Sequence, residues 1–256
     1  MSHKRRVILG IETSNPSAWI MGTQRPGVAL LIHEPDGAPG ASPLIIRADI
    51  DPQAFQQDQL MSAVETAARE ANVRPRDIMS VGVSLGPGGF TAVRVGVMVA
   101  KMICEVTGAS CVGVPTADAV VARFQRDPAS EDKLFVASVL ASKGAGAFIT
   151  THRRNDSAQD FGGAVARFMF IVDVLKAVSH GEWPRQTHLI GDRFTPGPII
   201  DAVLAAGGTV SVPAFDAATI ATLTSKYLPV DPAALVPLYP REPEAVTKWR
   251  ALHGAR

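Results

Sequence analysis

Residues 91–107 constrain the fold of this chain more than any other segment, because they have the pattern of a helix that is apolar on nearly every side. Only Arg94, Lys101 and Glu105 interrupt a run made mostly of valine, methionine, alanine and isoleucine. A helix of this kind is buried on more than one face. One face can cover a sheet, and the other is covered either by a second lobe or by another chain.

Small side chains recur along this predicted helix at every fourth position. They allow another backbone to approach closely, because no bulky group stands in the way. The spacing predicts a contact face formed by Ala92, Gly96, Ala100 and Cys104. If this face meets a partner, replacing Gly96 with leucine is expected to block complex formation while the monomer still folds.

A glycine-rich turn at 84–91 connects the preceding predicted strand to this helix. Free N–H groups at a helix start can hold an anion, so the turn is a candidate phosphate site. It lacks the Gly-Lys-Ser/Thr of a P-loop and the third glycine of a dinucleotide fingerprint, so a tight strand–helix connection is the other interpretation. The candidate phosphate contacts are Gly86, Gly88, Gly89 and Thr91 in this turn and Arg94 in the first turn of the following helix.

Hydrophobic periodicity predicts the order of elements in the first half. Three apolar runs bounded by turn residues open the chain, and segments of helical spacing then alternate with short apolar runs. The predicted order is β-β-β-α-β-α-β-α. The strands are expected at 7–12, 27–33, 43–47, 80–85 and 110–114, and the helices at 54–72, 91–107 and 116–123.

The second half begins after a polar, proline-containing segment at 126–133. We expect an N-terminal lobe over 1–122, a divergent second lobe over 123–236, and a proline-rich tail at 237–256 that returns to the first lobe. The elements expected after residue 133 are strands at 134–140, 147–151, 187–191 and 209–212, and helices at 163–178, 198–206, 217–227 and 244–252.

The charge balance excludes several classes of protein. The chain has 25 Lys and Arg residues against 24 Asp and Glu residues, a net charge of +1. This balance argues against nucleic-acid binding through bulk charge and against an acidic disordered chain. The apolar run at 7–11 is shorter than the core of a secretory signal, and no segment has the length of a membrane span. We therefore expect a cytoplasmic protein without membrane contact.

Residues for metal binding or catalysis do not occur in a recognisable arrangement. No two histidines have helical spacing, and Cys104 and Cys111 both lie in apolar segments. No Gly-x-Ser-x-Gly nucleophile motif occurs. The sequence therefore predicts no metal site and no catalytic residue in this chain.

Residues 80–122 read SVGVSLGPGGFTAVRVGVMVAKMICEVTGASCVGVPTADAVVA. This stretch resembles the signature region of the TsaB/YeaZ family, in which GxGPGSFTGxRxG is followed by AKGLA and by a strand that ends in Gly-Val. ILGIETS at 8–14 resembles the family's first strand, and PLYPR at 237–241 resembles its closing Pro-x-Tyr-Leu-Arg. The resemblance is strong over 1–122 and faint over 123–230.

The resemblance implies a two-lobed α/β fold of the actin-like ATPase (ASKHA, ribonuclease H-like) class. TsaB-type proteins are non-catalytic companions of the threonylcarbamoyl transferase TsaD, which with an ATPase installs N6-threonylcarbamoyl on adenosine 37 of tRNA. The resemblance therefore implies a scaffold that binds a TsaD-like transferase and forms a homodimer when alone. It implies a TsaE-like ATPase as a further partner and indirect contact with tRNA. The implied interface residues are Leu60, Met61, Val64, Ala92, Val95, Gly96, Val99, Ala100 and Ile103.

An alternative function is an ATP-binding phosphotransferase or ATPase of the same superfold. It would use Glu12, Thr13 and Ser14 at the end of the first predicted strand, where actin-like ATPases place an acidic group near phosphate, together with the turn at 86–91. For the scaffold function no cofactor is expected in this chain, and ATP or ADP belongs to the complex. The second lobe departs from the family at 141–148, which lacks the usual Asp-Ala-Arg. A structural binding module in another pathway is a third interpretation.

Overall fold

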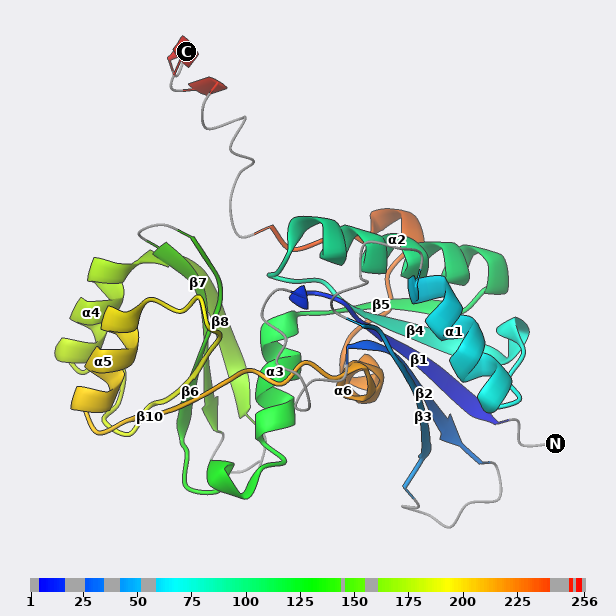
Figure 1. The fold of residues 1–256 in the computed structure, drawn as a ribbon, viewed down its shortest axis with the longest axis horizontal. Helices are drawn as coiled ribbons and strands as arrows, with labels where there is room; N and C mark the ends of the chain where they lie inside the picture. Colours follow the sequence, from blue (N-terminus) through cyan, green and yellow to red (C-terminus); the bar gives the residue numbers. More distant parts are fainter. Residues whose placement is uncertain are drawn as a thin grey trace.

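The chain folds into two α/β lobes that lie side by side (Figure 1). The computed structural model describes residues 5–16, 26–34, 42–51, 59–143, 146–154, 161–239, 249–250 and 252–254. The helix predicted at 244–252 and the start of the helix predicted at 54–72 fall largely outside these residues. No helix in the described part of the chain is long and apolar enough to cross a membrane.

The first lobe has a five-stranded mixed sheet in the order β3-β2-β1-β4-β5. Strands β1, β2 and β3 are antiparallel neighbours, whereas β4 and β5 run parallel to β1. The predicted order of elements for this half is confirmed. Its elements are β1 (Arg6–Glu12), β2 (Gly27–His33), β3 (Leu44–Asp49), α1 (Gln59–Glu70), β4 (Ile78–Ser84), α2 (Phe90–Thr107), β5 (Ser110–Val114) and α3 (Thr116–Phe124).

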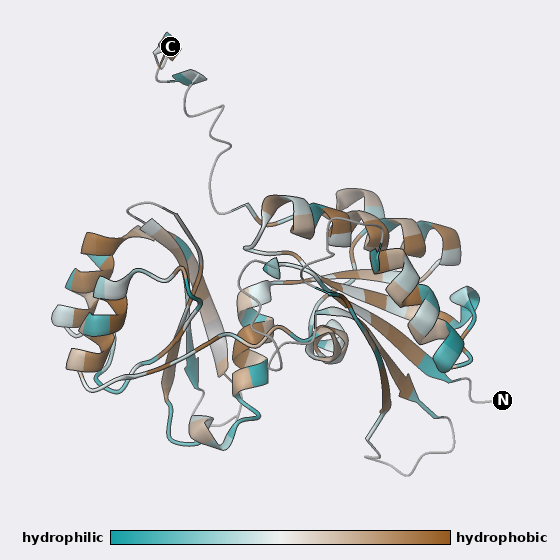
Figure 2. Cartoon of the chain, in the orientation of Figure 1, coloured by the Kyte–Doolittle hydropathy of each residue, from teal (hydrophilic) through white to brown (hydrophobic). Residues whose placement is uncertain are grey.

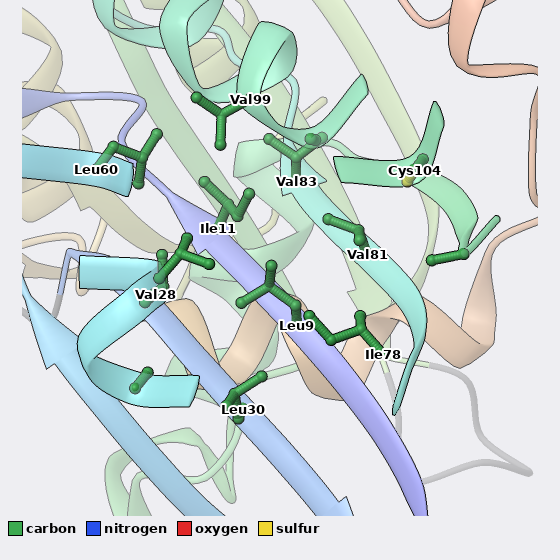
Figure 3. Close-up of a cluster of buried hydrophobic side chains, with 14 of the residues drawn as sticks. Leu9, Ile11, Val28, Leu30, Leu60, Ile78, Val81, Val83, Val99 and Cys104 are labelled. Carbon is green, nitrogen blue, oxygen red and sulfur yellow. The ribbon is translucent and has the colours of Figure 1, made fainter. Parts of the chain in front are cut away.

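The core of this lobe lies between the sheet and helices α1 and α2. Because side chains alternate along a strand, Val7, Leu9 and Ile11 of β1 all point to this face. Figure 3 shows Leu9 and Ile11 among buried side chains of the neighbouring strands, with Leu60 of α1 beside them. On the opposite face Gly10 lies against α6 (Ala217–Leu223), where a Cβ atom would overlap with the Ala217 carbonyl oxygen.

The second lobe repeats the strand order of the first. Its sheet runs β10-β9-β6-β7-β8, with β6, β7 and β8 antiparallel and with β9 and β10 parallel to β6. The first strand of each lobe in the sequence, β1 or β6, is central in its sheet, so the two lobes are copies of one topology. The remaining elements are β6 (Phe135–Lys143), β7 (Gly146–Arg154), β8 (Phe161–Phe170), α4 (Ile171–Ser179), β9 (His188–Gly191), α5 (Gly197–Ala205) and β10 (Thr209–Ser211).

One predicted element of this lobe is wrong. The helix expected at 163–178 is the edge strand β8 up to Phe170 and becomes helix α4 only from Ile171. Apolar residues in this stretch fit helical spacing, but β8 pairs along most of its length with β7. Tertiary pairing overrides the local pattern here, since β-structure depends on neighbouring strands more than on intrinsic preference.

Helices α3 and α6 lie between the two sheets (Figure 1). Helix α6 packs on β1, β2 and β4, although it follows the second sheet in sequence. Helix α3 buries Val120 and Val121 in a cluster with Val136 and Leu140 of β6. The lobes therefore share a buried apolar junction. The domain limits at 122 and 236 stay predictions.

A polar network crosses the same junction. Asp118 of α3 accepts a hydrogen bond from the Tyr227 hydroxyl, and its other carboxylate oxygen lies 2.8 Å from Nε2 of His152 on β7. Burial and the bond to Asp118 raise the pKa of Tyr227. His152 is buried and Tyr227 is partly buried, so the Asp118 carboxylate supplies a hydrogen-bond partner to two side chains at the junction.

Replacing Asp118 with asparagine is expected to lower the free energy of unfolding by about 1–2 kcal/mol. The amide keeps one acceptor oxygen but presents N–H groups where the second partner needs an acceptor. Urea denaturation at fixed pH measures the change. Asp132→Asn is the control, because that carboxylate is exposed. An equal loss in both variants would contradict a structural role for the Asp118 network.

Candidate functional site

The glycine turn after β4 lies directly against the turn after β1. The Gly89 N–H donates to the Ser14 carbonyl oxygen at 2.6 Å, and Asn15 Nδ2 donates to the Pro87 carbonyl oxygen at 3.1 Å. A Cβ atom on Gly88 would overlap with the Ser14 carbonyl oxygen. The two segments predicted from the sequence to form a phosphate site, the end of β1 and the glycine turn, are therefore in contact. Part of the space that an anion would need is filled by the chain's own backbone.

Glu12 points into the protein at the end of β1. Its side chain is about 1% exposed, and Oε1 accepts hydrogen bonds from the Ser14 N–H at 2.6 Å and from Ser84 Oγ at 3.2 Å. Burial raises the pKa of Glu12 to about 7. The neighbouring Thr13 donates its hydroxyl hydrogen to the Ala92 carbonyl oxygen at 2.9 Å. The Glu12 side chain therefore connects the end of β1 to β4, and the Thr13 side chain connects it to α2.

The other predicted phosphate contacts, Thr91 and Arg94, lie on the surface at the start of α2. The Arg94 guanidinium stacks over the Phe90 ring, 4.6 Å from its centroid. The Phe90 ring in turn lies 5.4 Å from that of Tyr239 in the tail. The predicted set therefore divides into a buried part around Glu12 and an exposed part, and its nucleotide role stays a prediction.

Most of the predicted interface residues are buried inside the first lobe. A Cβ atom on Gly96 would lie 2.6 Å from Thr13 Oγ1 and 3.6 Å from a methyl group of Val83. The small-residue stripe thus lets α2 approach the chain's own sheet, and not a partner, which corrects the expectation from the sequence. The members of the predicted interface that are buried within the first lobe are Leu60, Ala92, Gly96, Val99 and Ala100, while Val64 is largely buried but lines the groove between α1 and α2.

The opposite side of α2 is apolar and exposed. Of the predicted residues only Val95 on α2 and Met61 on the adjacent α1 are exposed, and Ile103 is partly buried. Met98 and Met102 are each 57% exposed and Val106 is 84% exposed, and none of the three was singled out from the sequence. Their spacing of four residues, with Val95 three residues before Met98, was a usable signal, since it defines one helical face. We call Met61, Val95, Met98, Met102 and Val106 the methionine–valine face.

A groove runs between α1 and α2 beneath this face. It has a volume of about 720 Å³, and Met61, Ala68, Met102, Ile103 and Val106 line it. The hydropathy colouring in Figure 2 shows the apolar residues that continue along α2. The methionine–valine face therefore combines an apolar surface with a concave floor.

The tail covers a different flank of α2. Lys101 Nζ donates to the carbonyl oxygens of Ala233 at 3.1 Å and of Leu235 at 3.2 Å, and Leu235 is buried in the first core. Further along, the Leu238 N–H donates to the Leu85 carbonyl oxygen at 2.8 Å. The described tail thus returns to the first lobe but lines no part of the groove.

The described residues contain no group of three or more His, Cys, Asp or Glu side chains that could hold a metal ion. Cys104 and Cys111 are both buried, and neither forms a disulfide. The features that stand out are therefore the joined turns around Glu12 and the methionine–valine face.

Comparisons with known proteins place these features in context. Residues 53–161 match the family model of TsaD, tRNA N6-adenosine threonylcarbamoyltransferase. A comparison with curated proteins gives no match. A solved structure of a Pseudomonas aeruginosa protein, described as similar to peptidase YEAZ, has a TM-score of 0.67 at 15% identity, covering 92% of this chain and 100% of its own. YeaZ from Pseudomonas aeruginosa has a TM-score of 0.63 at 14% identity, covering 91% and 99%.

These matches bear on the expectations from the sequence. The two-lobed, actin-like α/β fold is confirmed by the duplicated topology and by the likeness to YeaZ over nearly the whole chain. The predicted resemblance to the TsaB/YeaZ family is confirmed by the same likeness together with the TsaD-type segment.

Proposed function

We propose that this chain is a non-catalytic scaffold subunit for a TsaD-type threonylcarbamoyl transferase, acting in the N6-threonylcarbamoyladenosine modification of tRNA at adenosine 37. The observation that carries the proposal is the methionine–valine face, which the described residues leave exposed. The TsaD-type segment at 53–161 and the YeaZ-like fold support the tRNA-modification setting. The chain acts in the cytoplasm.

The physical argument is that this face gains free energy when a partner covers it. Complete burial of a valine or methionine side chain contributes about 1.5–3 kcal/mol. The five side chains are at least two-fifths exposed, so each retains a large part of that gain for a partner. Methionine adapts its shape to different surfaces. The same face therefore suits a transferase and, when the transferase is absent, a second copy of this chain.

The remaining partners follow from the same scaffold role. A TsaE-like ATPase joins the complex, ATP or ADP is held by the complex with no cofactor in this chain, and tRNA is bound mainly through the transferase. What supports the absence of a cofactor here is the contact of Ser14 and Asn15 with the glycine turn, which takes up the Gly89 N–H and part of the space that a phosphate would need.

The alternative function, an ATP-binding phosphotransferase or ATPase, is favoured by one observation. Glu12 and the glycine turn meet at the ends of β1 and β4, where a nucleotide would enter. Tight, magnesium-dependent binding of ATP to the isolated chain would support this alternative. Binding of ATP only after a transferase is added would support the scaffold.

Replacing Met98 with aspartate tests the scaffold function. The charge would be buried without a partner in the complex, so affinity for a TsaD-type transferase from the same cell is expected to fall at least about tenfold. Self-association of the isolated chain should fall as well. Calorimetric titration and sedimentation measure the two effects, and the folded monomer should be unchanged because the side chain is exposed.

Leu204→Asp is the matched control, since Leu204 is an exposed apolar residue on α5 of the other lobe. It should bind the transferase like the parent chain. Undiminished binding by Met98→Asp and Met102→Asp would show that the transferase binds another surface and would contradict the proposal.

A further inference from the structure

Two arginine-containing segments that are far apart in the sequence meet at one end of the first sheet. Arg5 precedes β1 and Arg6 is its first residue, while Arg74 lies before and Arg76 within the short 3₁₀ turn Pro75–Asp77 that leads into β4. Because β1 and β4 are parallel neighbours, their entry segments lie side by side. The four arginines line a surface hollow of about 1130 Å³, which we call the arginine hollow.

The charges in the arginine hollow do not balance. Asp77 is its one acidic lining residue in the described part of the chain, and it forms a two-point contact with Arg74, with N–O distances of 2.9 and 3.0 Å. Arg5 pairs with Glu34 at 2.7 Å. Within the described residues no ion pair or side-chain hydrogen bond engages Arg6 or Arg76, so two guanidinium groups remain available. In a chain of net charge +1 this is a local excess of positive charge.

A second charged hollow lies at the junction of the lobes and gives a useful comparison. It also has four basic lining residues, Arg47, Arg123, Arg126 and Lys133, but three aspartates line it too. Lys133 pairs with Asp132, and Arg47 lies 3.6 Å from Asp216. The positive charge there is largely compensated, whereas in the arginine hollow it is not.

The arginine hollow also adjoins the surface proposed for the partner. Val73 lines both the arginine hollow and the groove between α1 and α2, and Pro75 lines the groove one residue away from Arg74 and Arg76. A macromolecule that lies across the edge of a complex formed on the methionine–valine face would therefore reach these arginines.

We propose that the arginine hollow binds the phosphate backbone of RNA, which adds a direct contact of this chain with the tRNA. The guanidinium group suits this ligand because its planar set of donors matches phosphate oxygens and it stays charged. Such contacts position a nucleic acid without reading its sequence. The inference rests on the proposed function for the identity of the RNA, but the contact itself is measured on the isolated chain.

The test uses the full chain and a fluorescently labelled tRNA transcript, with binding measured at several salt concentrations. The double variant Arg6→Gln/Arg76→Gln removes the two unengaged charges. Its affinity is expected to be about tenfold weaker near 50 mM salt, and the slope of log K against log salt is expected to be shallower by about 2. Arg123→Gln/Arg126→Gln changes the net charge equally and should stay within about twofold of the parent chain.

Three results would overturn the inference. The first is an equal loss of tRNA binding in both double variants, which would indicate bulk charge alone. The second is an absence of tRNA binding by the parent chain near 50 mM salt. The third is that the parent chain binds inorganic pyrophosphate saturably but does not bind tRNA, and that the Arg6→Gln/Arg76→Gln variant loses the pyrophosphate binding. This result would indicate a site for free phosphate compounds.

The outcome is separable from that of the scaffold proposal. Met98→Asp should keep tRNA binding by the isolated chain, and Arg6→Gln/Arg76→Gln should keep binding to the transferase. Failure of the transferase experiment thus leaves the RNA result standing, and failure of the RNA experiment leaves the scaffold standing.

Discussion

Gly96→Leu is expected to destabilise the first lobe by at least about 3 kcal/mol, and not to act as a selective block of complex formation. Even one added carbon at Gly96 would lie 2.6 Å from the Thr13 hydroxyl oxygen. Thr13 is fully buried, and its hydroxyl donates a hydrogen bond to the Ala92 carbonyl oxygen of the same helix, so it has no space into which to move. A leucine can be accommodated only if α2 moves away from β1 and β4, which would expose the core.

Thermal and urea denaturation of the isolated chain measure this loss. Val95→Leu is the control, because it enlarges the neighbouring residue on the exposed side of α2 and should change stability by less than about 0.5 kcal/mol. Thr13→Ala should partly rescue Gly96→Ala, because it removes the atom that the new methyl group meets. A Gly96→Leu chain with unchanged stability that fails to bind the transferase would restore the interface role.

The misassigned face of α2 shows what periodicity can and cannot predict. The helix and its left-handed terminating Gly108 could be predicted from the sequence, whereas the burial expected on a second face is not present, since Met98, Met102 and Val106 are exposed. The pattern of Ala92, Gly96, Ala100 and Cys104 also predicts close approach of a backbone. It does not say which backbone, because a strand of the same chain and a helix of another chain impose the same steric requirement.

The second lobe was harder to predict because its two decisive features are not local. The edge strand β8 owes its conformation to pairing with β7. The duplication of the first sheet appears only in the strand order, since the two halves share no obvious sequence repeat. By contrast, strands β2 and β5 have the predicted bounds, because turn residues flank both of their apolar runs.

The candidate site could be predicted in part, because the strand order determines which segments meet. Parallel strands β1 and β4 end at the same edge of the sheet, so residues 12–14 and 86–89 had to lie near one another. That Ser14 and Asn15 bond directly to the glycine turn depends on loop geometry, which the sequence pattern does not specify. The arginine hollow likewise needed the structure, because its halves are about 70 residues apart.

The stability of the fold is expected to depend on pH through Glu12. Burial raises the pKa of this carboxyl from its ordinary value of 4.5 to about 7 in the folded chain. Between these values the folded chain holds a proton that the unfolded chain has released, so the free energy of unfolding falls as pH rises from about 4.5 to 7. At about 1.4 kcal/mol for each pH unit, the full loss is about 3 kcal/mol.

Glu12→Gln should remove this loss, because the amide is neutral at every pH and its oxygen still accepts from the Ser14 N–H. The variant is expected to match the parent chain near pH 4.5 and to exceed it by about 3 kcal/mol above pH 7. Urea denaturation of both chains across this range isolates Glu12, since all other titrating groups are common to them. Glu105→Gln, at an exposed position on α2, is the control. A difference between parent and variant that stays constant from pH 5 to 8 would mean that Glu12 is ionised in the fold, and a cation or a hydrogen-bond donor beyond Ser14 and Ser84 would then have to stabilise its charge.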